Sequence, residues 1–222
     1  MKKTCFIVGA GEYSECFVPD ESTYIIAADA GYETLISTGI NPDLVVGDFD
    51  SVKNMPVHSN IITVPTEKND TDMSLAIKHG LSHGCKTFII DGGLGGRLDH
   101  TIANIQLLKM LSLNNAVGVL LGKELCLTAI TNSQLEFNNG LAGIVSVFTP
   151  GEKAEGVTLK GLKYPLDNYT LTDTYPIGVS NEFTDNINTS GHVSVQNGTL
   201  IITWTTQPCA LTFNSKATIK LT

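Results

Sequence analysis

The chain lacks any hydrophobic run long enough to span a membrane, although hydrophobic residues make up 42% of its 222 positions. It has no low-complexity segment and no internal repeat, and 16% of its residues are charged. This composition is ordinary for a globular protein and argues against a disordered one. The apolar stretch after Lys2 and Lys3 is too short for a signal peptide, and Glu12 and Glu15 follow it closely. We therefore expect a soluble, cytoplasmic protein that does not bind a membrane.

Basic runs and paired cysteines are also missing from the sequence. The formal net charge is −8, and the longest run of basic residues is Lys2-Lys3. We therefore do not expect a long nucleic-acid groove, because phosphate backbones demand a basic surface. The five cysteines are scattered, odd in number and never in CxxC spacing. This pattern favours free thiols in a reducing compartment over a disulfide framework.

Residues 1–123 alternate between short apolar segments and helical patterns. Apolar runs of this length are typical of strands buried on both faces of a parallel sheet. We therefore predict a doubly wound, mostly parallel α/β domain over residues 1–123. Strands are expected at Thr4–Val8, Tyr24–Ala28, Leu44–Val46, Ile61–Val64, Thr87–Ile90 and Val117–Leu121, and helices at Tyr32–Ser37, Thr71–Ser82 and Thr101–Leu111.

After residue 122 the helical patterns fade, and short strand-like segments recur between turn residues. Asn138-Asn139-Gly140 and Asn197-Gly198 predict hairpins, because Asn and Gly tolerate the positive φ that such turns need. We predict a β-sandwich over residues 124–222, with the tail 210–222 unassigned. Strands are expected at Glu124–Ile130, Gln134–Phe137, Ile144–Phe148, Val157–Leu159, Gly178–Glu182, His192–Gln196 and Thr199–Thr205.

Five aspartates lie on three short segments of the first hundred residues. Asp48 and Asp50 follow a predicted strand, Asp70 and Asp72 stand at a predicted helix start, and Asp99 follows a glycine-rich loop. In an alternating α/β chain such positions can meet at one edge of the sheet. Carboxylates without a Cys or His cage are hard oxygen ligands, which suit Mg²⁺ bound against phosphates. The pattern therefore predicts nucleotide chemistry.

Each acidic pair also has a plainer interpretation. Asp48 and Asp50 point to the same side of an extended chain and can share one ion, but Asp also favours turns. Asp70 and Asp72 stand where good N-caps are found, so one can cap the helix while the other points into a cleft. Lys68 adds a cation beside this second pair.

The segment GGLGGRLDH, residues 92–100, is the strongest local pattern. Its glycines follow a predicted strand and would let backbone N–H groups approach a phosphate closely. Arg97 can bind phosphate oxygens in a bidentate manner, and Asp99 can bind a metal or cap the next helix. It is not a Walker loop, because no Lys-Ser/Thr follows the glycines. The earlier Gly9-Ala10-Gly11 is interpreted only as a tight strand-to-helix turn.

Together these segments resemble the thiamine pyrophosphokinase family, in order and spacing, over nearly the whole chain. One departure is Ala30-Gly31, where the family usually shows paired glycines. The matching motifs are Ala27-Ala28-Asp29-Ala30-Gly31, Pro42–Ser51, Lys68–Ala76, Arg97–His100 continuing into Ala103-Asn104, and Val179-Ser180-Asn181-Glu182-Phe183.

The resemblance implies a Mg²⁺-dependent transferase that moves the pyrophosphoryl group of ATP to the hydroxyl of thiamine, without a covalent intermediate. The products would be thiamine diphosphate and AMP. It also implies a homodimer, with an ATP- and Mg-binding catalytic domain at 1–123 and a thiamine-binding and dimerisation domain at 124–222.

The resemblance also assigns roles to individual residues, and we favour Asp70 or Asp72 as the proton acceptor. The catalytic set is Lys68, Asp70, Asp72 and Arg97, and the metal set is Asp48, Asp50, Asp70 and Asp72. The nucleotide-binding set is Asp29, Gly31, Ser51, Gly92, Gly93, Gly95, Gly96 and Asn104, and the substrate-binding set is Asp99, Ser180, Asn181 and Phe183.

Two other classes of function remain open from the residues alone. Leu44–Val52 is also similar to the nucleophile motif of haloacid-dehalogenase phosphatases, with Asp48 as the nucleophile. However, that motif normally lies on the first strand of its fold, and here two predicted strands precede it. The third possibility is a non-catalytic ligand-binding module whose acids lie in surface turns.

Overall fold

The computed structural model describes residues 3–49, 56–63, 65, 70–184, 188–205, 209–213 and 217–221. The chain divides into two compact units, the first comprising Met1–Leu107 and Gly118–Lys123 and the second Leu108–Val117 and Glu124–Thr222. The second unit thus takes in ten residues, 108–117, that the sequence assigned to the first domain. Among the helices of the described residues, none has the length and apolar character needed to cross a membrane.

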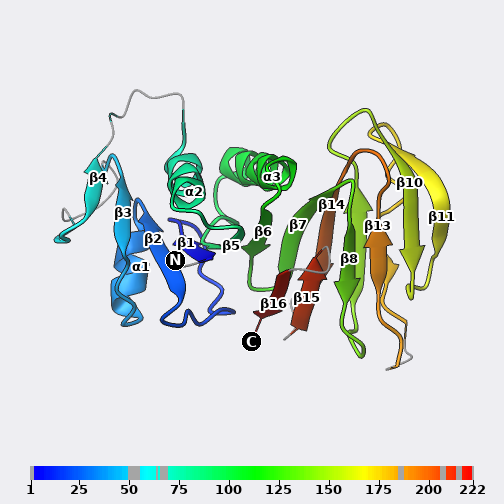
Figure 1. Ribbon diagram of the computed structural model, residues 1–222, viewed down its shortest axis with the longest axis horizontal. Helices are drawn as coiled ribbons and strands as arrows, with labels where there is room; N and C mark the ends of the chain where they lie inside the picture. The colour runs from blue at the N-terminus through cyan, green and yellow to red at the C-terminus, as the bar shows by residue number, and fades with distance from the viewer. Residues whose placement is uncertain are drawn as a thin grey trace. The chain divides into compact units, whose positions relative to one another are not determined.

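The first unit is built on a sheet of mainly parallel strands (Figure 1). Strand β1 pairs in parallel with β2 on one side and with β5 on the other, and β3 and β4 extend the parallel order beyond β2. β1 is buried from Cys5 to Val8, as its uninterrupted apolar sequence requires. The strand order is β6-β5-β1-β2-β3-β4, with β1 at Thr4–Val8, β2 at Thr23–Ala28, β3 at Leu44–Gly47, β4 at Ile61–Thr63, β5 at Thr87–Asp91 and β6 at Val117–Leu121.

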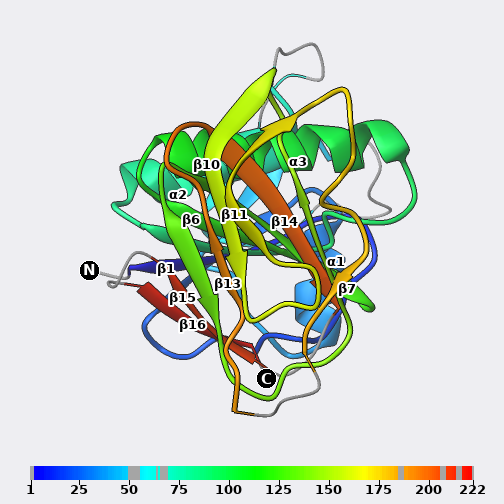
Figure 2. The ribbon, with the colours of Figure 1, turned by 90° about the vertical axis from the view of Figure 1, so that its right-hand side faces the viewer.

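Three helices connect these strands: α1 (Gly31–Ser37), α2 (Asp72–Ser82) and α3 (Leu98–Leu113). The crossover through α1 steps from β2 to β3, whereas the crossover through α2 steps back across the sheet from β4 to β5. Right-handed crossovers in opposite directions place their helices on opposite faces of a sheet. Figures 1 and 2 show α1 and α2 on opposite sides of the strands.

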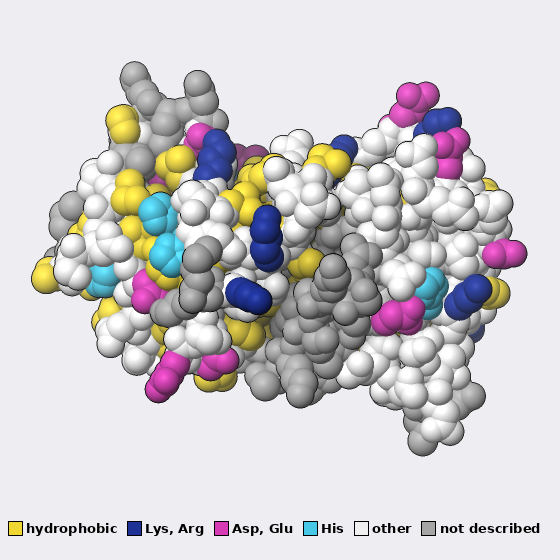
Figure 3. All heavy atoms as spheres, viewed as in Figure 1, with side chains coloured by type: hydrophobic (Ala, Val, Ile, Leu, Met, Phe, Trp, Pro, Cys, Tyr) yellow, Lys and Arg dark blue, Asp and Glu magenta, His cyan; other side chains and the backbone are white. Residues whose placement is uncertain are grey.

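An aromatic cluster lies at the amino end of this sheet. The ring of Tyr24, in β2, stacks on His83 with a centroid distance of 4.0 Å and on His79 at 6.3 Å. His79 is near the end of α2, and burial followed by the charge of His83 lowers its pKa. On the face of the molecule seen in Figure 3, histidine side chains lie beside hydrophobic ones.

The second unit consists of two antiparallel sheets, and Figure 2 shows β10, β11 and β13 of one of them together in a layer. Phe137 of β8 contacts Trp204 of β14 with ring centroids 5.6 Å apart, which joins the two sheets through a buried core. One sheet has the order β12-β9-β14-β7, with β12 at Asn181–Glu182, β9 at Ile144–Phe148, β14 at Thr199–Thr205 and β7 at Leu125–Thr131. The other has the order β11-β10-β13-β8-β15-β16, with β11 at Leu166–Thr172, β10 at Lys153–Lys160, β13 at His192–Ser194, β8 at Gln134–Phe137, β15 at Cys209–Phe213 and β16 at Ala217–Leu221.

The predicted division into an α/β region and an antiparallel β region is confirmed, but both predicted hairpins are wrong. Asn197-Gly198 joins β13 to β14, which pair in different sheets, and residues 138–143 likewise join β8 and β9 of different sheets. Turn residues indicate where a chain changes direction, and alternation indicates a strand, but neither identifies the partner strand. The sequence also missed β11 and left unassigned the tail that forms β15 and β16.

Candidate active site

A cavity of about 430 Å³ opens in the first unit, within the size range of small-molecule sites. It lies at the carboxyl ends of β1, β2 and β5, where open α/β sheets usually bind ligands. The first turns of α2 and α3 complete it. Its lining consists of Gly9, Ala10, Gly11, Ala28, Asp29, Thr71, Asp72, Met73, Gly92, Gly93, Leu94, Gly95, Gly96, Arg97, His100 and Asn104.

The glycine-rich loop after β5 forms a wall of this cavity, and its carbonyl groups are held by the protein. The carbonyl oxygens of residues 92, 93 and 94 accept hydrogen bonds in turn from the N–H of Gly11 (2.7 Å), the side-chain amide of Asn104 (2.7 Å) and the N–H of Glu12 (3.1 Å). Within the described part of the chain, no acceptor meets the N–H groups of residues 93–96. The wall therefore has donors to offer to an anion.

Close contact between two loops requires glycine at both of them. A Cβ atom on Gly11 would lie 2.6 Å from the carbonyl oxygen of Gly92, and Gly92 itself has a φ of +65°. A Cβ on Gly92 would in turn overlap the carbonyl oxygen of Gly9. The Gly9–Gly11 segment, interpreted from sequence only as a tight turn before a helix, is thus part of the cavity wall, and no helix follows it before β2.

Asp91 holds this wall in place through hydrogen bonds, and no sequence pattern singled it out. Its side chain is fully buried at the end of β5 and accepts hydrogen bonds from Ser14 and from the N–H of Gly92. Burial raises the pKa of the carboxyl group, although these hydrogen bonds oppose that shift. The available signal was a single acidic residue at the end of an otherwise apolar strand.

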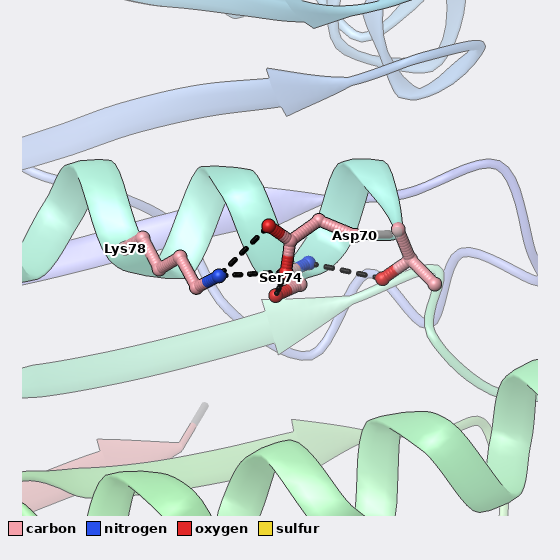
Figure 4. A network of polar contacts seen from close by, with 4 residues as sticks. Asp70, Ser74 and Lys78 are labelled. Carbon is pink, nitrogen blue, oxygen red and sulfur yellow. Dashed lines mark hydrogen bonds and ion pairs between the residues drawn. The ribbon is translucent and has the colours of Figure 1, made fainter. Parts of the chain in front are cut away.

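The structure separates the two acids at the start of α2. Thr71 is the N-cap, and its hydroxyl accepts a hydrogen bond from the N–H of Ser74 at 3.1 Å. Asp72 lines the cavity. The carboxylate of Asp70 instead accepts hydrogen bonds from Lys78 Nζ at 2.6 and 2.8 Å and from Ser74 Oγ at 2.9 Å (Figure 4). Of the two, Asp72 therefore has the position expected of a residue that contacts substrate.

Arg97 also lines the cavity and forms an exposed ion pair with Asp99. Its Nε and Nη2 donate to the two carboxylate oxygens of Asp99 at 3.2 and 2.6 Å. The pair raises the pKa of Arg97 and lowers that of Asp99. Asp99 is not part of the lining, whereas His100, to which the sequence gave no role, and the predicted Asn104 both are.

The other predicted nucleotide and metal residues differ in position. Asp29 lines the cavity with a φ of +51°, and Asp48 follows β3 without being part of the lining. A Cβ on Gly31 would overlap the carbonyl oxygen of Val8, so close packing alone explains this glycine. Among the described residues, no three His, Cys, Asp or Glu side chains converge on a metal position. Asp50, Ser51 and Lys68 lie outside the described residues.

The substrate residues predicted in the second unit already have partners in the protein. The side chain of Asn181 is buried and bonds both the N–H and the carbonyl oxygen of Tyr164, at 3.0 and 2.7 Å. Phe183 is buried against Phe137, with ring centroids 5.1 Å apart. Ser180 is exposed with a φ of +56°. Direct contact of these three residues with substrate stays a prediction.

Comparisons with known proteins identify the family. The family model for the thiamin pyrophosphokinase catalytic domain matches residues 18–120, and that for the thiamin pyrophosphokinase vitamin B1 binding domain matches residues 132–200. The chain belongs to the thiamin pyrophosphokinase family. Thiamine pyrophosphokinase of Bacillus subtilis (strain 168) is 32% identical over 190 residues, which cover 82% of this chain and 87% of that protein. The resemblance inferred from the motifs is thus confirmed.

Solved structures support the same assignment. The crystal structure of thiamine pyrophosphokinase from Bacillus subtilis is similar with a TM-score of 0.80 and 30% identity, over 92% of this chain and all of that one. The thiamin pyrophosphokinase from Geobacillus thermodenitrificans gives a TM-score of 0.77 at 26% identity, over 92% of this chain and 98% of that one. At 15% identity and a TM-score of 0.73, over 93% of this chain and 90% of that one, the Candida albicans protein shares the fold. Neither the phosphatase nor the non-catalytic interpretation is favoured.

Proposed function

We propose that this chain transfers the pyrophosphoryl group of ATP to the hydroxyl of thiamine, giving thiamine diphosphate and AMP. Family membership supports the reaction class. The single observation that carries the proposal is the glycine-rich wall: its carbonyl groups at residues 92–94 accept hydrogen bonds from the protein, while the N–H groups of residues 93–96 meet no acceptor among the described residues. Such a wall suits a polyphosphate, because fixed N–H dipoles stabilise negative charge without a basic surface.

The triphosphate of ATP is proposed to lie along residues 92–96. The amino ends of α2 and α3 both contribute residues to the cavity lining, and their dipoles favour bound anions. Arg97 would add charge-assisted hydrogen bonds to phosphate oxygens. Lys68, which the sequence placed beside Asp70 and Asp72, is proposed as a second cation.

Mg²⁺ is proposed to bind on the acidic side of the cavity. Asp29 and Asp72 are part of the lining, and the oxygens of their carboxylates are the kind of ligand that Mg²⁺ prefers. Asp48 and Asp50 are retained as further proposed ligands, while Asp70 is less well placed because Lys78 and Ser74 hold its carboxylate. When bound, the ion would neutralise part of the phosphate charge.

Asp72 is proposed as the proton acceptor for the attacking hydroxyl. The oxygen of thiamine would attack the β-phosphorus, the proton would pass to the Asp72 carboxylate, and the bond to the AMP oxygen would break. Most of the rate enhancement would come from alignment of the two substrates and from neutralisation of phosphate charge. No covalent phosphoenzyme is needed.

Thiamine is proposed to contact residues of the second unit. The family model over residues 132–200 is described as a vitamin B1 binding domain, and the exposed Ser180 lies within it. Asn181 bonds the backbone of Tyr164 and Phe183 packs on Phe137, and these contacts would hold the backbone of such a site in place. A homodimer, a cytoplasmic location, and the finer description as a doubly wound domain followed by a β-sandwich are proposed with the same function.

An assay with thiamine and MgATP, scored separately for AMP and ADP, tests the function. Formation of AMP and thiamine diphosphate in equal amounts is the expected result. ADP as the nucleotide product would mean transfer of a single phosphoryl group and would refute the proposal. A phosphorylated Asp48 trapped during turnover would favour the phosphatase mechanism instead.

A further inference from the structure

One buried carboxylate joins the two loops that form the cavity wall. Asp91 Oδ1 accepts hydrogen bonds from the N–H of Ser14 at 3.0 Å and from the N–H of Gly92 at 2.7 Å. Asp91 Oδ2 accepts a hydrogen bond from Ser14 Oγ at 2.7 Å. Ser14 follows β1 and Gly92 follows β5, so the carboxylate links segments 77 residues apart in the sequence.

The backbone beside this carboxylate continues the same link. The N–H of Gly9 donates to the carbonyl oxygen of Asp91 at 2.8 Å, and the N–H of Gly11 donates to that of Gly92 at 2.7 Å. Asp91 is fully buried and is not part of the cavity lining, so it does not touch a ligand there. A buried charge is costly unless it is hydrogen-bonded, and hydrophobic packing alone would serve a purely structural position better.

We propose that Asp91 is a positioning residue for the nucleotide: through Ser14 and Gly92 it fixes the loop whose N–H groups bind the triphosphate. This proposal rests on the proposed function of the same cavity. The carboxylate binds the N–H of Gly92, the first residue of the loop, and residues 93–96, whose N–H groups meet no acceptor among the described residues, line the cavity. Without the carboxylate, the loop would have to become ordered when the nucleotide binds. The free-energy cost of that ordering would lower the affinity for nucleotide.

The amide variant D91N separates the geometry from the charge. It keeps an oxygen that can accept from the N–H groups of Ser14 and Gly92, and its NH₂ group can donate to Ser14 Oγ. D91A removes every one of these bonds. The control variant D43A also deletes a carboxylate that accepts a backbone N–H, from Ile25 at 2.8 Å, but at the amino end of the sheet, away from the cavity.

The test measures the KM for MgATP and for thiamine in the AMP assay, together with urea unfolding of each variant. D91A is expected to raise the KM for MgATP at least about tenfold, a change of about 1.4 kcal/mol, and to leave the KM for thiamine within about twofold. D91N should recover most of the loss. D43A should lower stability without changing the KM for MgATP.

A KM for MgATP within twofold of wild type in folded D91A would overturn the proposal and leave Asp91 a merely structural residue. If D91A does not fold, S14A decides: a rise of threefold or more supports the proposal, and an unchanged KM overturns it. If wild type binds MgATP but forms no AMP, only the proposed function fails, and calorimetric MgATP affinities of the same variants decide the role of Asp91. If wild type binds no MgATP, both proposals fail.

Discussion

Asparagine substitutions at Asp70 and Asp72 should have opposite consequences, although the two acids are only two positions apart. Asp72 lines the cavity, whereas the Asp70 carboxylate is bonded to Lys78 and Ser74 of α2. D72N should therefore lose most of its activity, and D70N should lose stability with little change in activity.

The magnitudes follow from these contacts. Removal of a positioned proton acceptor lowers kcat by about 10²–10⁴-fold, and we expect that loss for D72N. Side-chain exposures of 56% for Lys78 and 33% for Asp70 make theirs a partly solvated ion pair, and such a pair contributes about 0–1 kcal/mol. D70N loses this pair but keeps an oxygen that can accept the hydrogen bond from Ser74, so it should lower the free energy of unfolding by up to about 1 kcal/mol.

Steady-state AMP formation and urea unfolding of both variants provide the measurement. For a chain of this length, a loss of up to about 1 kcal/mol corresponds to a fall in Tm of up to about 4 °C. The kcat of D70N should stay within about threefold of wild type, because the Asp70 carboxylate that it replaces is not part of the cavity lining. An equal loss of kcat in the two variants would refute the reasoning, as would a D72N protein with near-wild-type turnover.

Three further predictions concern the wall, the second unit and pH. G11A should raise the KM for MgATP and lower the free energy of unfolding by about 1–3 kcal/mol, because its new methyl group overpacks against residues 92–94. The control G39A, at a φ of +77° with open space around it, should lower stability and leave the KM unchanged. N181A should lower the free energy of unfolding by about 1–3 kcal/mol, measured in urea, because it removes both hydrogen bonds between the buried Asn181 side chain and the backbone of Tyr164. The lowered pKa of His79 means that the folded state binds fewer protons than the unfolded state, whose reference pKa is 6.5. Stability should therefore fall as pH drops below that value, and H79Q should show a smaller fall in its urea midpoint.

The fold class was predictable because the relevant patterns are local. Continuous apolar runs mark strands covered on both faces, and nearly every predicted strand of the first unit lies within a residue or two of its observed limits. Pairing in the second unit was not predictable in the same way. Chain segments around Asn197-Gly198 alternate as a hairpin would, yet they belong to different sheets. Sheet membership depends on contacts between residues far apart in the sequence, such as that of the Phe137 and Trp204 rings, which no local pattern contains.

The site was predictable to the extent that its residues carry unusual local sequence. The glycines of residues 92–96 and Arg97 stand out, and the structure places them at the cavity. Asp72 could not be distinguished from Asp70, because that difference depends on where Lys78 extends along the helix. Asp91 and Gly9–Gly11 were missed because their role exists only where two distant loops meet.

A chain with a net charge of −8 needs a local means of binding a triphosphate. The described lining offers two carboxylates, Asp29 and Asp72, against one guanidinium, Arg97, so side-chain charge alone does not supply it. The N–H groups of residues 93–95 carry partial positive charge, and their direction is fixed because they share peptide planes with the bonded carbonyl groups of residues 92–94. Such dipoles need no reorganisation when the nucleotide binds. If the triphosphate binds as proposed, we therefore expect the glycine conformations and the buried Asp91 to affect nucleotide affinity more than the overall charge of the protein does.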